Sequence, residues 1–166
     1  GLFLIVGMIY ERRHTRMISD FGGLSKVMPV FATFFMIITL SSIALPGTNG
    51  FVGEFLILLG AFKSNVVYGV LATTGVVMGA VYMLWMFQRV MFGVITKEEN
   101  RNLKDLGKRE VLILVSMVFF IILMGVYPKM FFNKMDTSVS EYLSFVKQKN
   151  AQYRTVQQGT TEAGMV

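Results

Sequence analysis

The sequence predicts an all-α integral membrane protein, and three observations lead to that fold class. Charged residues make up 16% of the 166 residues and hydrophobic residues 54%, whereas a typical soluble domain is about 25% charged. The charges are clustered, and the uncharged runs between the clusters are long enough to cross a hydrocarbon core of about 30 Å. Backbone polar groups in lipid must bond within their own segment, so these runs are helical.

Missing residue types exclude several kinds of chemistry. The chain has no cysteine, which excludes disulfides, thiol catalysis and Cys-ligated iron–sulfur clusters. One histidine disfavours a His-built metal site, and the glycine-rich loops that bind nucleotides are absent. The net charge of +6 fits basic residues that flank membrane spans better than a nucleic-acid surface. We therefore expect neither a metal nor a cofactor in this chain.

Residues 1–10 form the first apolar run, which is too short to cross the hydrocarbon core. No basic segment precedes it, as one would in a signal peptide. We expect residues 1–10 to be the end of a truncated transmembrane helix and residues 11–26 to be a basic loop. His14 in this loop is expected to be solvated, and the alternative is that it loads protons at a channel mouth.

The next apolar segment, residues 27–62, is too long for one straight crossing. As a single helix it would measure about 54 Å at about 1.5 Å per residue. Its middle contains Pro46, Gly47 and Gly50. Proline removes an N–H donor and clashes with the preceding turn, and glycine accepts non-helical angles. The sequence therefore predicts a discontinuous transmembrane helix that is broken at residues 45–50.

The distribution of Lys and Arg decides between one broken crossing and a hairpin. Four of these residues lie in residues 11–26 and six in residues 89–110, but only Lys63 lies in the link between the apolar blocks. A single broken crossing puts both basic loops on one side, and a hairpin would separate them. The positive-inside rule favours the single crossing. We expect both loops to be cytoplasmic and the C-terminal tail to lie on the outer side.

Two further crossings are predicted on either side of the second basic loop. Residues 66–88 carry no charge and contain Gly75-x-x-x-Gly79, a motif that lets another helix pack closely. Residues 111–132 form the last apolar block, which continues past a proline. Both blocks have the length of a transmembrane helix.

The C-terminal region is expected to lie outside the membrane core. Residues 136–149 repeat apolar side chains at helical spacing, and Ser138 with Glu141 forms a capping-box signature. This pattern predicts an amphipathic helix on lipid or on a partner subunit. Residues 150–166 are polar, and their composition predicts a disordered tail.

Glu54 is the acidic residue that the predicted membrane region places far from either end. An ionised carboxylate at mid-membrane costs about 2.5–3.5 kcal/mol, so Glu54 should face a bundle interior or water. Desolvation favours its protonated form, whereas the N-terminus of the short helix after the break favours the ionised form. A carboxyl group balanced in this way can act as a proton relay. The alternative is a structural glutamate that stays protonated or ion-paired.

Hydroxyl and amide side chains surround the predicted break. Two interpretations are equally open: they line a water path to Glu54, or they bond the carbonyl one helical turn back. The candidate water-path residues are Thr39, Ser41, Ser42, Thr48 and Asn49.

Three segments of the sequence resemble one family. They read Tyr-Glu-Arg-Arg-His-Thr-Arg at 10–16, Gly-Gly-Leu at 22–24 and Leu-Pro-Gly-Thr-Asn-Gly-Phe-Val-Gly-Glu-Phe at 45–55. They resemble the antiporter-like M chains of bacterial respiratory complex I, the proton-pumping NADH–quinone oxidoreductase, whose mitochondrial counterpart is NADH dehydrogenase subunit 4. The resemblance extends from residue 1 to about residue 146. Sister antiporter-like chains place a lysine, not a glutamate, in the equivalent broken helix.

The resemblance implies a parent subunit of fourteen helices in the bacterial inner membrane, of which this chain would be the C-terminal part. Glu54 would be the ionisable residue of the broken twelfth helix, and Pro46 and Gly47 would form the break. FMN, iron–sulfur clusters, quinone and NADH would belong to other subunits, and chains L and N would be neighbours. The alternatives are a subunit of a related Na⁺/H⁺ antiporter or membrane-bound hydrogenase and, from another class, a structural membrane anchor.

Overall fold

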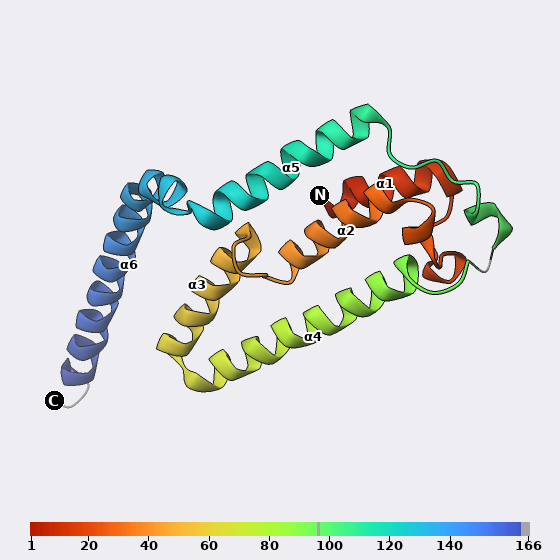
Figure 1. The fold of residues 1–166 in the computed structure, drawn as a ribbon. Helices are drawn as coiled ribbons and strands as arrows, with labels where there is room; N and C mark the ends of the chain where they lie inside the picture. Colours follow the sequence, from red (N-terminus) through yellow and green to blue (C-terminus); the bar gives the residue numbers. More distant parts are fainter. Residues whose placement is uncertain (96, 164–166) are drawn as a thin grey trace. The chain divides into compact units, whose positions relative to one another are not determined.

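The described part of the molecule is built from helices (Figure 1). The computed structural model describes the backbone of residues 1–95 and 97–163, and the side chains of these except 147 and 150–163. No strand occurs in the described residues, which confirms the all-α class. The chain divides into two compact units, Gly1–Val126 and Tyr127–Val166. The helices are α1 (Leu2–Arg13), α2 (Pro29–Ser42), α3 (Asn49–Ser64), α4 (Val66–Met91), α5 (Lys108–Val126) and α6 (Lys129–Ala163), with short turns η1 (Ile18–Asp20), η2 (Leu24–Lys26) and η3 (Glu98–Asn100).

Helices α4 and α5 are long and apolar enough to cross a membrane. Only 11% and 6% of their most apolar windows are buried, whereas the core helix of a soluble protein is mostly buried. Large apolar side chains such as Met78 of α4 and Phe119 of α5 are 68% and 59% exposed. Exposed apolar surface on this scale requires lipid or further helices to cover it.

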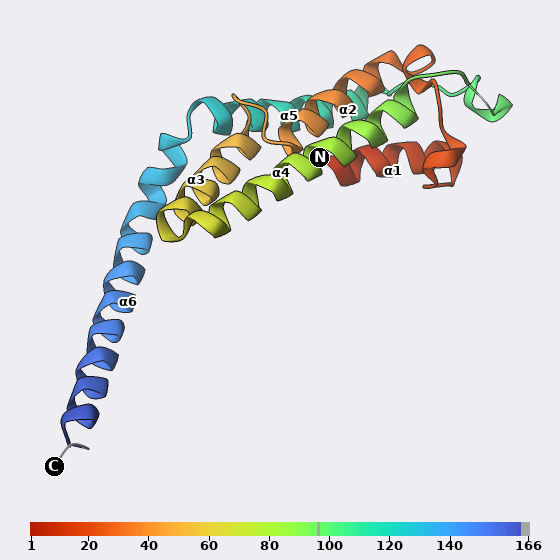
Figure 2. The same ribbon diagram turned by 90° about the horizontal axis from the view of Figure 1, so that it is seen from below.

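Helices α2 and α3 together run opposite to α4 in the first unit (Figures 1 and 2). They contain 14 and 16 residues, against 26 in α4. A tight turn joins α3 to α4, where the Asn65 side chain accepts a hydrogen bond of 2.8 Å from the Val67 N–H. An added Cβ at Gly69 would overlap the Phe62 ring, so glycine permits the close approach after this turn.

The buried core of the first unit joins four helices. Side chains of α1, α2, α4 and α5 meet there, and the rings of Phe35 and Phe87 lie 5.2 Å apart. Leu24 of η2 and Met28 are fully buried in the same cluster. The core members with the lowest exposure are Ile5, Leu24, Met28, Phe31, Met91 and Leu114. Because the core joins these helices, the loop after α1 lies next to the loop after α4.

These two loops bond to each other through backbone and side chains. The Gly23 N–H donates to the Phe92 carbonyl oxygen at 3.0 Å, and Ser25 Oγ donates to the Met91 carbonyl oxygen at 2.7 Å. Further links are the Arg13–Glu99 and Lys97–Asp20 ion pairs and the hydrogen bond from Asn100 Nδ2 to the Asp20 carbonyl oxygen. The loops that carry most of the positive charge therefore form one contiguous structure.

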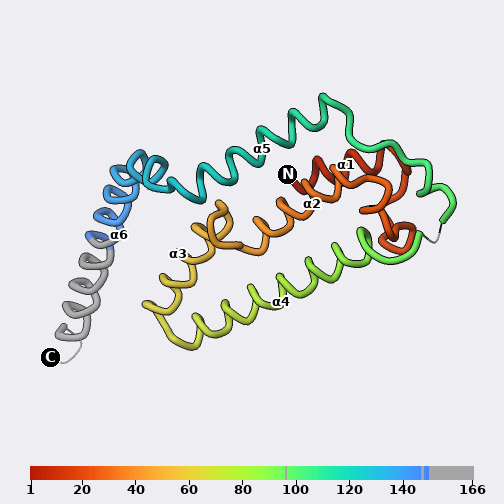
Figure 3. The backbone as a smooth tube through the Cα atoms, in the orientation of Figure 1, coloured from red at the N-terminus to blue at the C-terminus, as the bar shows by residue number. Residues whose placement is uncertain are grey.

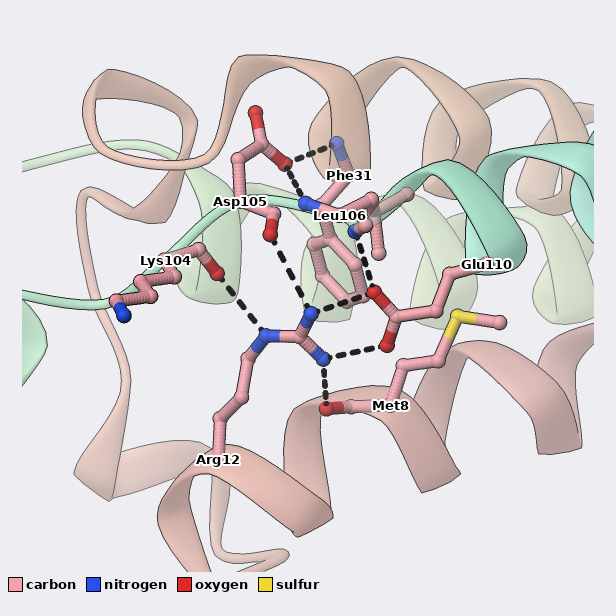
Figure 4. Close-up of polar contacts among 8 residues, drawn as sticks. Met8, Arg12, Phe31, Lys104, Asp105, Leu106 and Glu110 are labelled. Atoms are coloured by element: carbon pink, nitrogen blue, oxygen red, sulfur yellow. Dashed lines mark hydrogen bonds and ion pairs between the residues drawn. The ribbon is translucent and has the colours of Figure 1, made fainter.

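Arg12 at the end of α1 is the centre of this structure (Figure 4). Its guanidinium donates to both carboxylate oxygens of Glu110 on α5, at 2.8 and 2.6 Å. It also donates to the carbonyl oxygens of Met8, Lys104 and Asp105, at 2.8, 2.9 and 3.4 Å. A bidentate Arg–carboxylate pair fixes both distance and orientation. Arg12 thereby holds the end of α1 against the start of α5.

Asp105 extends the same cluster to the start of α2. Its carboxylate accepts hydrogen bonds from the N–H groups of Val30 and Phe31, at 2.9 and 3.1 Å. The first N–H groups of a helix have no partner within the helix, and a negative charge there is favoured by the helix dipole. Asp105, in the loop after α4, thus caps α2, the helix that follows the loop after α1.

Replacing Arg12 by methionine is expected to lower the free energy of unfolding by about 2–3 kcal/mol. The change leaves the Glu110 carboxylate without its partner, and the two side chains are only 18% and 22% exposed. The matched control is Arg101→Met, because the Arg101–Glu98 pair is 59% and 78% exposed; its loss should cost about 0–1 kcal/mol. Thermal unfolding of the purified protein in detergent measures both variants, and equal losses would contradict this role of Arg12.

Asp20 makes the loop contact sensitive to acid. The hydrogen bond from Lys97, and then that from Thr15, lower the pKa of Asp20 below its ordinary value of 3.8. A pKa that is lower in the folded state means that Asp20 stabilises the fold above pH 3.8 and that this contribution is lost as the pH falls through the folded-state pKa. Asp20→Asn should therefore lower the melting temperature at neutral pH, and the difference from the wild type should vanish in acid. A difference that grows with acidity would contradict this assignment.

Two boundaries near the C-terminus differ from the sequence prediction. The last apolar block was expected to run through residues 111–132, but α5 ends at Val126 and α6 begins at Lys129. Pro128 lacks an N–H group and disfavours helical angles in the residue before it, so it separates the two helices. Its carbonyl oxygen accepts the first bonds of α6, from Phe131 and Phe132.

Helix α6 is longer than the sequence predicts. It begins before the expected segment 136–149, so Ser138 lies inside the helix and not at its start. It also continues to Ala163, where the polar composition predicts disorder. This stretch contains Ala, Gln, Arg and Glu, which have high helix propensity, and it contains no proline. Residues 164–166 of the predicted disordered tail lie outside the described residues.

Candidate functional site

The chain between α2 and α3 leaves the helical conformation over residues 43–48 (Figure 3). The sequence predicts a break at 45–50 caused by Pro46, Gly47 and Gly50. Instead, α2 ends at Ser42, and Ala44 takes the left-handed conformation with φ 60°. The Leu45 N–H bonds the Leu40 carbonyl oxygen at 3.0 Å and the Ala44 N–H bonds that of Ser41 at 3.3 Å. This pair of bonds is a Schellman motif, which ends the helix before the proline.

Two glycines allow other backbone to approach this segment closely. An added Cβ at Gly50 of α3 would overlap the Ser41 carbonyl oxygen of α2. An added Cβ at Gly125 of α5 would overlap the backbone of Gly47 and Thr48. Gly47 itself has φ 92°, which side-chain-bearing residues rarely adopt. The break is therefore fixed by α5 as well as by its own turn.

Glu54 lies in the second turn of α3 and faces α4. Its side chain is half-buried, and among the described residues its Oε2 atom is buried without a hydrogen-bond partner. The residue lines a cleft of about 390 Å³. The rest of the lining includes Ser42, Ala72, Gly75, Gly79, Ala80 and Tyr82. A buried carboxyl oxygen without a donor is costly, so it requires a proton, water or a partner outside the described chain.

The small residues of α4 provide the space beside Glu54. The Gly75-x-x-x-Gly79 motif was expected to pack against another helix. Within the described chain, an added Cβ at Gly75 meets no atom within 4 Å, and one at Gly79 meets only the Tyr82 ring, at 3.9 Å. Both glycines line the cleft beside Glu54.

The helix N-terminus contributes less to Glu54 than the sequence predicts. Because α3 begins at Asn49, Glu54 lies beyond its first turn. The effect of the helix dipole falls off within that first turn. The open cleft and the unpartnered oxygen therefore dominate the surroundings of this carboxyl group.

Two of the hydroxyl groups near the break bond a carbonyl oxygen about one turn back, which is one of the two expected arrangements. Ser42 Oγ donates to the Ile38 carbonyl oxygen at 2.9 Å, and Thr48 Oγ1 donates to that of Leu45 at 2.7 Å. Ser41 Oγ instead donates to Asn49 Oδ1 at 2.8 Å, which connects α2 to α3 across the break. Thr39 is fully buried, and its hydroxyl has no partner among the described residues.

His14 does not line the cleft that holds Glu54. It ends α1 in the left-handed conformation, with φ 51°, and its N–H bonds the Tyr10 carbonyl oxygen at 2.7 Å. Its ring is exposed and lies edge-on to the Tyr10 ring at 5.9 Å. In the part of the chain that the structure describes, no group of three His, Cys, Asp or Glu residues could hold a metal ion.

Sequence reasoning missed two residues of this region. Ala44 ends α2, although alanine has no preference for left-handed angles, so no local signal marks it. Gly125 is placed by the close approach of α5 to the break, which is a contact between separate helices. Only the folded arrangement identifies these roles.

The chain is similar in sequence to subunits of NADH oxidoreductases. Residues 1–79 match a family model described as NADH:quinone oxidoreductase/Mrp antiporter, TM. NADH-quinone oxidoreductase subunit M of Rickettsia typhi is 49% identical over 143 residues, 86% of this chain and 29% of that protein. NADH-ubiquinone oxidoreductase chain 4 of Marchantia polymorpha is 45% identical over 147 residues, 89% of this chain and 30% of that protein.

A solved structure is similar as well. A chain of respiratory complex I from Thermus thermophilus with bound NADH superposes with a TM-score of 0.69 at 39% identity. The match covers 77% of this chain and 27% of that one. The chain therefore spans less than a third of the length of these relatives.

Proposed function

This chain belongs to the family of M-type membrane subunits of NADH:quinone oxidoreductase, and we propose that it acts in the proton-translocating part of that complex. It would form the C-terminal part of a fourteen-helix antiporter-like subunit in the bacterial inner membrane. Redox chemistry on FMN, iron–sulfur clusters and quinone, with NADH as the electron donor, would take place in other subunits. Neighbouring antiporter-like chains L and N would be its partners.

The proposed topology has one broken crossing over residues 27–62, followed by crossings over 66–88 and 111–132. Loops 11–26 and 89–110 would both be cytoplasmic, and the ion pairs and hydrogen bonds between them support placement on one side. Residues 1–10 would end a further crossing. The segment 136–149 would lie as an amphipathic helix on the outer face, which its exposed Val139, Tyr142 and Leu143 support, and the tail 150–166 would also lie on that side.

Glu54 would be the proton-relay residue. The single observation that carries this assignment is its buried Oε2, which has no partner in the described chain and belongs to a residue lining an open cleft. A cation that approaches from the upstream part of the subunit would favour the ionised carboxylate, and its departure would favour the protonated one. Glu54 would release a proton to cleft water in the first state and take one up in the second.

The break and its polar side chains would carry water to Glu54. Pro46 and Gly47 lie in the non-helical segment 43–48, and Gly50 lies in α3, where it permits close approach to Ser41. Irregular backbone at membrane depth occurs where it lines a cavity. Thr39, Ser41, Ser42, Thr48 and Asn49 would line the path. His14 would serve at the channel mouth on the cytoplasmic loop.

Substitution of Glu54 by glutamine in the complete enzyme tests the proposal. An intact complex that reduces quinone but moves fewer protons supports the relay. Loss of assembly, or pumping at the wild-type level, supports a structural anchor instead. A subunit of a Na⁺/H⁺ antiporter or a membrane-bound hydrogenase would use the same acid with a different energy source, and the similarity of this chain to subunits of NADH oxidoreductases favours the NADH enzyme.

A further inference from the structure

Two clefts meet at Ser42, on either side of the broken helix. The first is the cleft of about 390 Å³ that Glu54 lines with α4. The second has a volume of about 520 Å³ and lies between α1, α2, α3 and α5. Its polar lining comes from Ser41, Ser42 and Asn49, and Met117 and Phe120 of α5 form part of its apolar wall.

Ser42 is better placed than the other hydroxyl residues to connect these clefts. It lines both of them and is exposed within the described chain. The Ser41 hydroxyl donates to Asn49 Oδ1, and Ser41 is itself buried. Thr48 is also buried and does not line the Glu54 cleft.

We infer that Ser42 passes protons between the Glu54 cleft and the cleft on the α1 and α5 side. This inference rests on the proposed function of Glu54. The Ser42 hydroxyl now donates to the Ile38 carbonyl oxygen at 2.9 Å, which leaves its oxygen lone pairs free to accept. A proton from water in one cleft binds Oγ as the Oγ–H proton leaves to water in the other. The hydroxyl ends neutral, so the step needs no other reactant.

The test compares Ser42→Val with Ser42→Thr in the complete, membrane-reconstituted enzyme. Valine and threonine have nearly the same volume, but only threonine keeps the hydroxyl. In Ser42→Val, the number of protons that this subunit moves per NADH oxidised is expected to fall by about ten-fold or more. Ser42→Thr is expected to keep most of it. Where Ser42→Val prevents assembly, Ser42→Ala takes its place beside Ser42→Thr.

Two further variants make the result specific. Ser116→Val is the matched control. The Ser116 hydroxyl also donates to a carbonyl oxygen of its own helix, that of Ile113, at 2.7 Å, and Ser116 lines neither cleft. Tyr82→Phe removes the tyrosine hydroxyl that borders the Glu54 cleft. Ser116→Val should pump at the wild-type level; loss of pumping in Tyr82→Phe with normal pumping in Ser42→Val would overturn the inference.

The outcomes separate this inference from the proposed function. Impaired pumping in Glu54→Gln with normal pumping in Ser42→Val overturns the Ser42 route alone. Equal impairment in Ser42→Val and Ser42→Thr also overturns it, since the hydroxyl would then be irrelevant. Normal pumping in Glu54→Gln overturns the proposed function and the inference together.

Discussion

A complex that carries Glu54→Gln is expected to lose this subunit's share of the protons moved per NADH oxidised. Glutamine keeps the size of the side chain but cannot exchange a proton, so transfer through this position should fall by about 100-fold or more. Quinone reduction should continue, because the redox groups lie in other subunits under the proposed function. Proton uptake and NADH oxidation, measured together in reconstituted vesicles, give the ratio directly.

The control for this variant is Glu98→Gln. Glu98 lies in η3, is 78% exposed and pairs only weakly with Arg101 at 3.4 Å. It should pump at the wild-type ratio. Glu54→Asp keeps an exchangeable proton on a side chain that is shorter by one methylene group, so it should retain more pumping than glutamine. If Glu54→Asp and Glu54→Gln were equally impaired, the position would depend on side-chain reach and not on proton exchange.

The second large effect is expected where α5 meets the break. Gly125→Ala places a methyl group on the backbone of Gly47 and Thr48, and backbone atoms cannot rotate away. We expect the free energy of unfolding to fall by about 3 kcal/mol, at the upper end of the usual cost of overpacking. Gly50→Ala should have a similar cost, because its methyl group meets the Ser41 carbonyl oxygen.

Gly60→Ala in α3 is the matched control for both glycines. An added Cβ at Gly60 meets no atom within 4 Å in the described chain, and alanine favours a helix interior over glycine by about 1 kcal/mol. Thermal unfolding in detergent should therefore show lower melting temperatures for Gly125→Ala and Gly50→Ala, and an unchanged or higher one for Gly60→Ala. Three equal values would contradict the close packing around the break.

Much of the fold could be predicted because its signals are local. Uncharged runs of membrane length predict helices over residues 66–88 and 111–132, and α4 (Val66–Met91) and α5 (Lys108–Val126) overlap these ranges. Two glycines and a proline in a long apolar block predict an interruption, and the chain leaves the helix within that block. Glu54 was singled out in the same way, since a lone acid in an apolar run has a high cost that requires a compensating environment.

The local signals were less accurate about where helices end. Helix α2 ends where Ala44 takes the left-handed backbone conformation, and alanine has no preference for that conformation. The polar composition of residues 150–163 predicted disorder, yet α6 continues through them. Composition measures how much apolar surface a segment can bury, and helix propensity is a separate quantity.

The sequence by itself determined the all-α class, the membrane-length helices and the single acid within the broken block. Only the tertiary structure decided that Arg12 pairs with Glu110, that Gly125 lies against the break, and that Glu54 and Ser42 share a cleft with α4. The physical reason is the range of the interactions. Hydropathy and charge act within a few residues along the chain, whereas these contacts join residues that are distant in sequence and meet only when the helices pack.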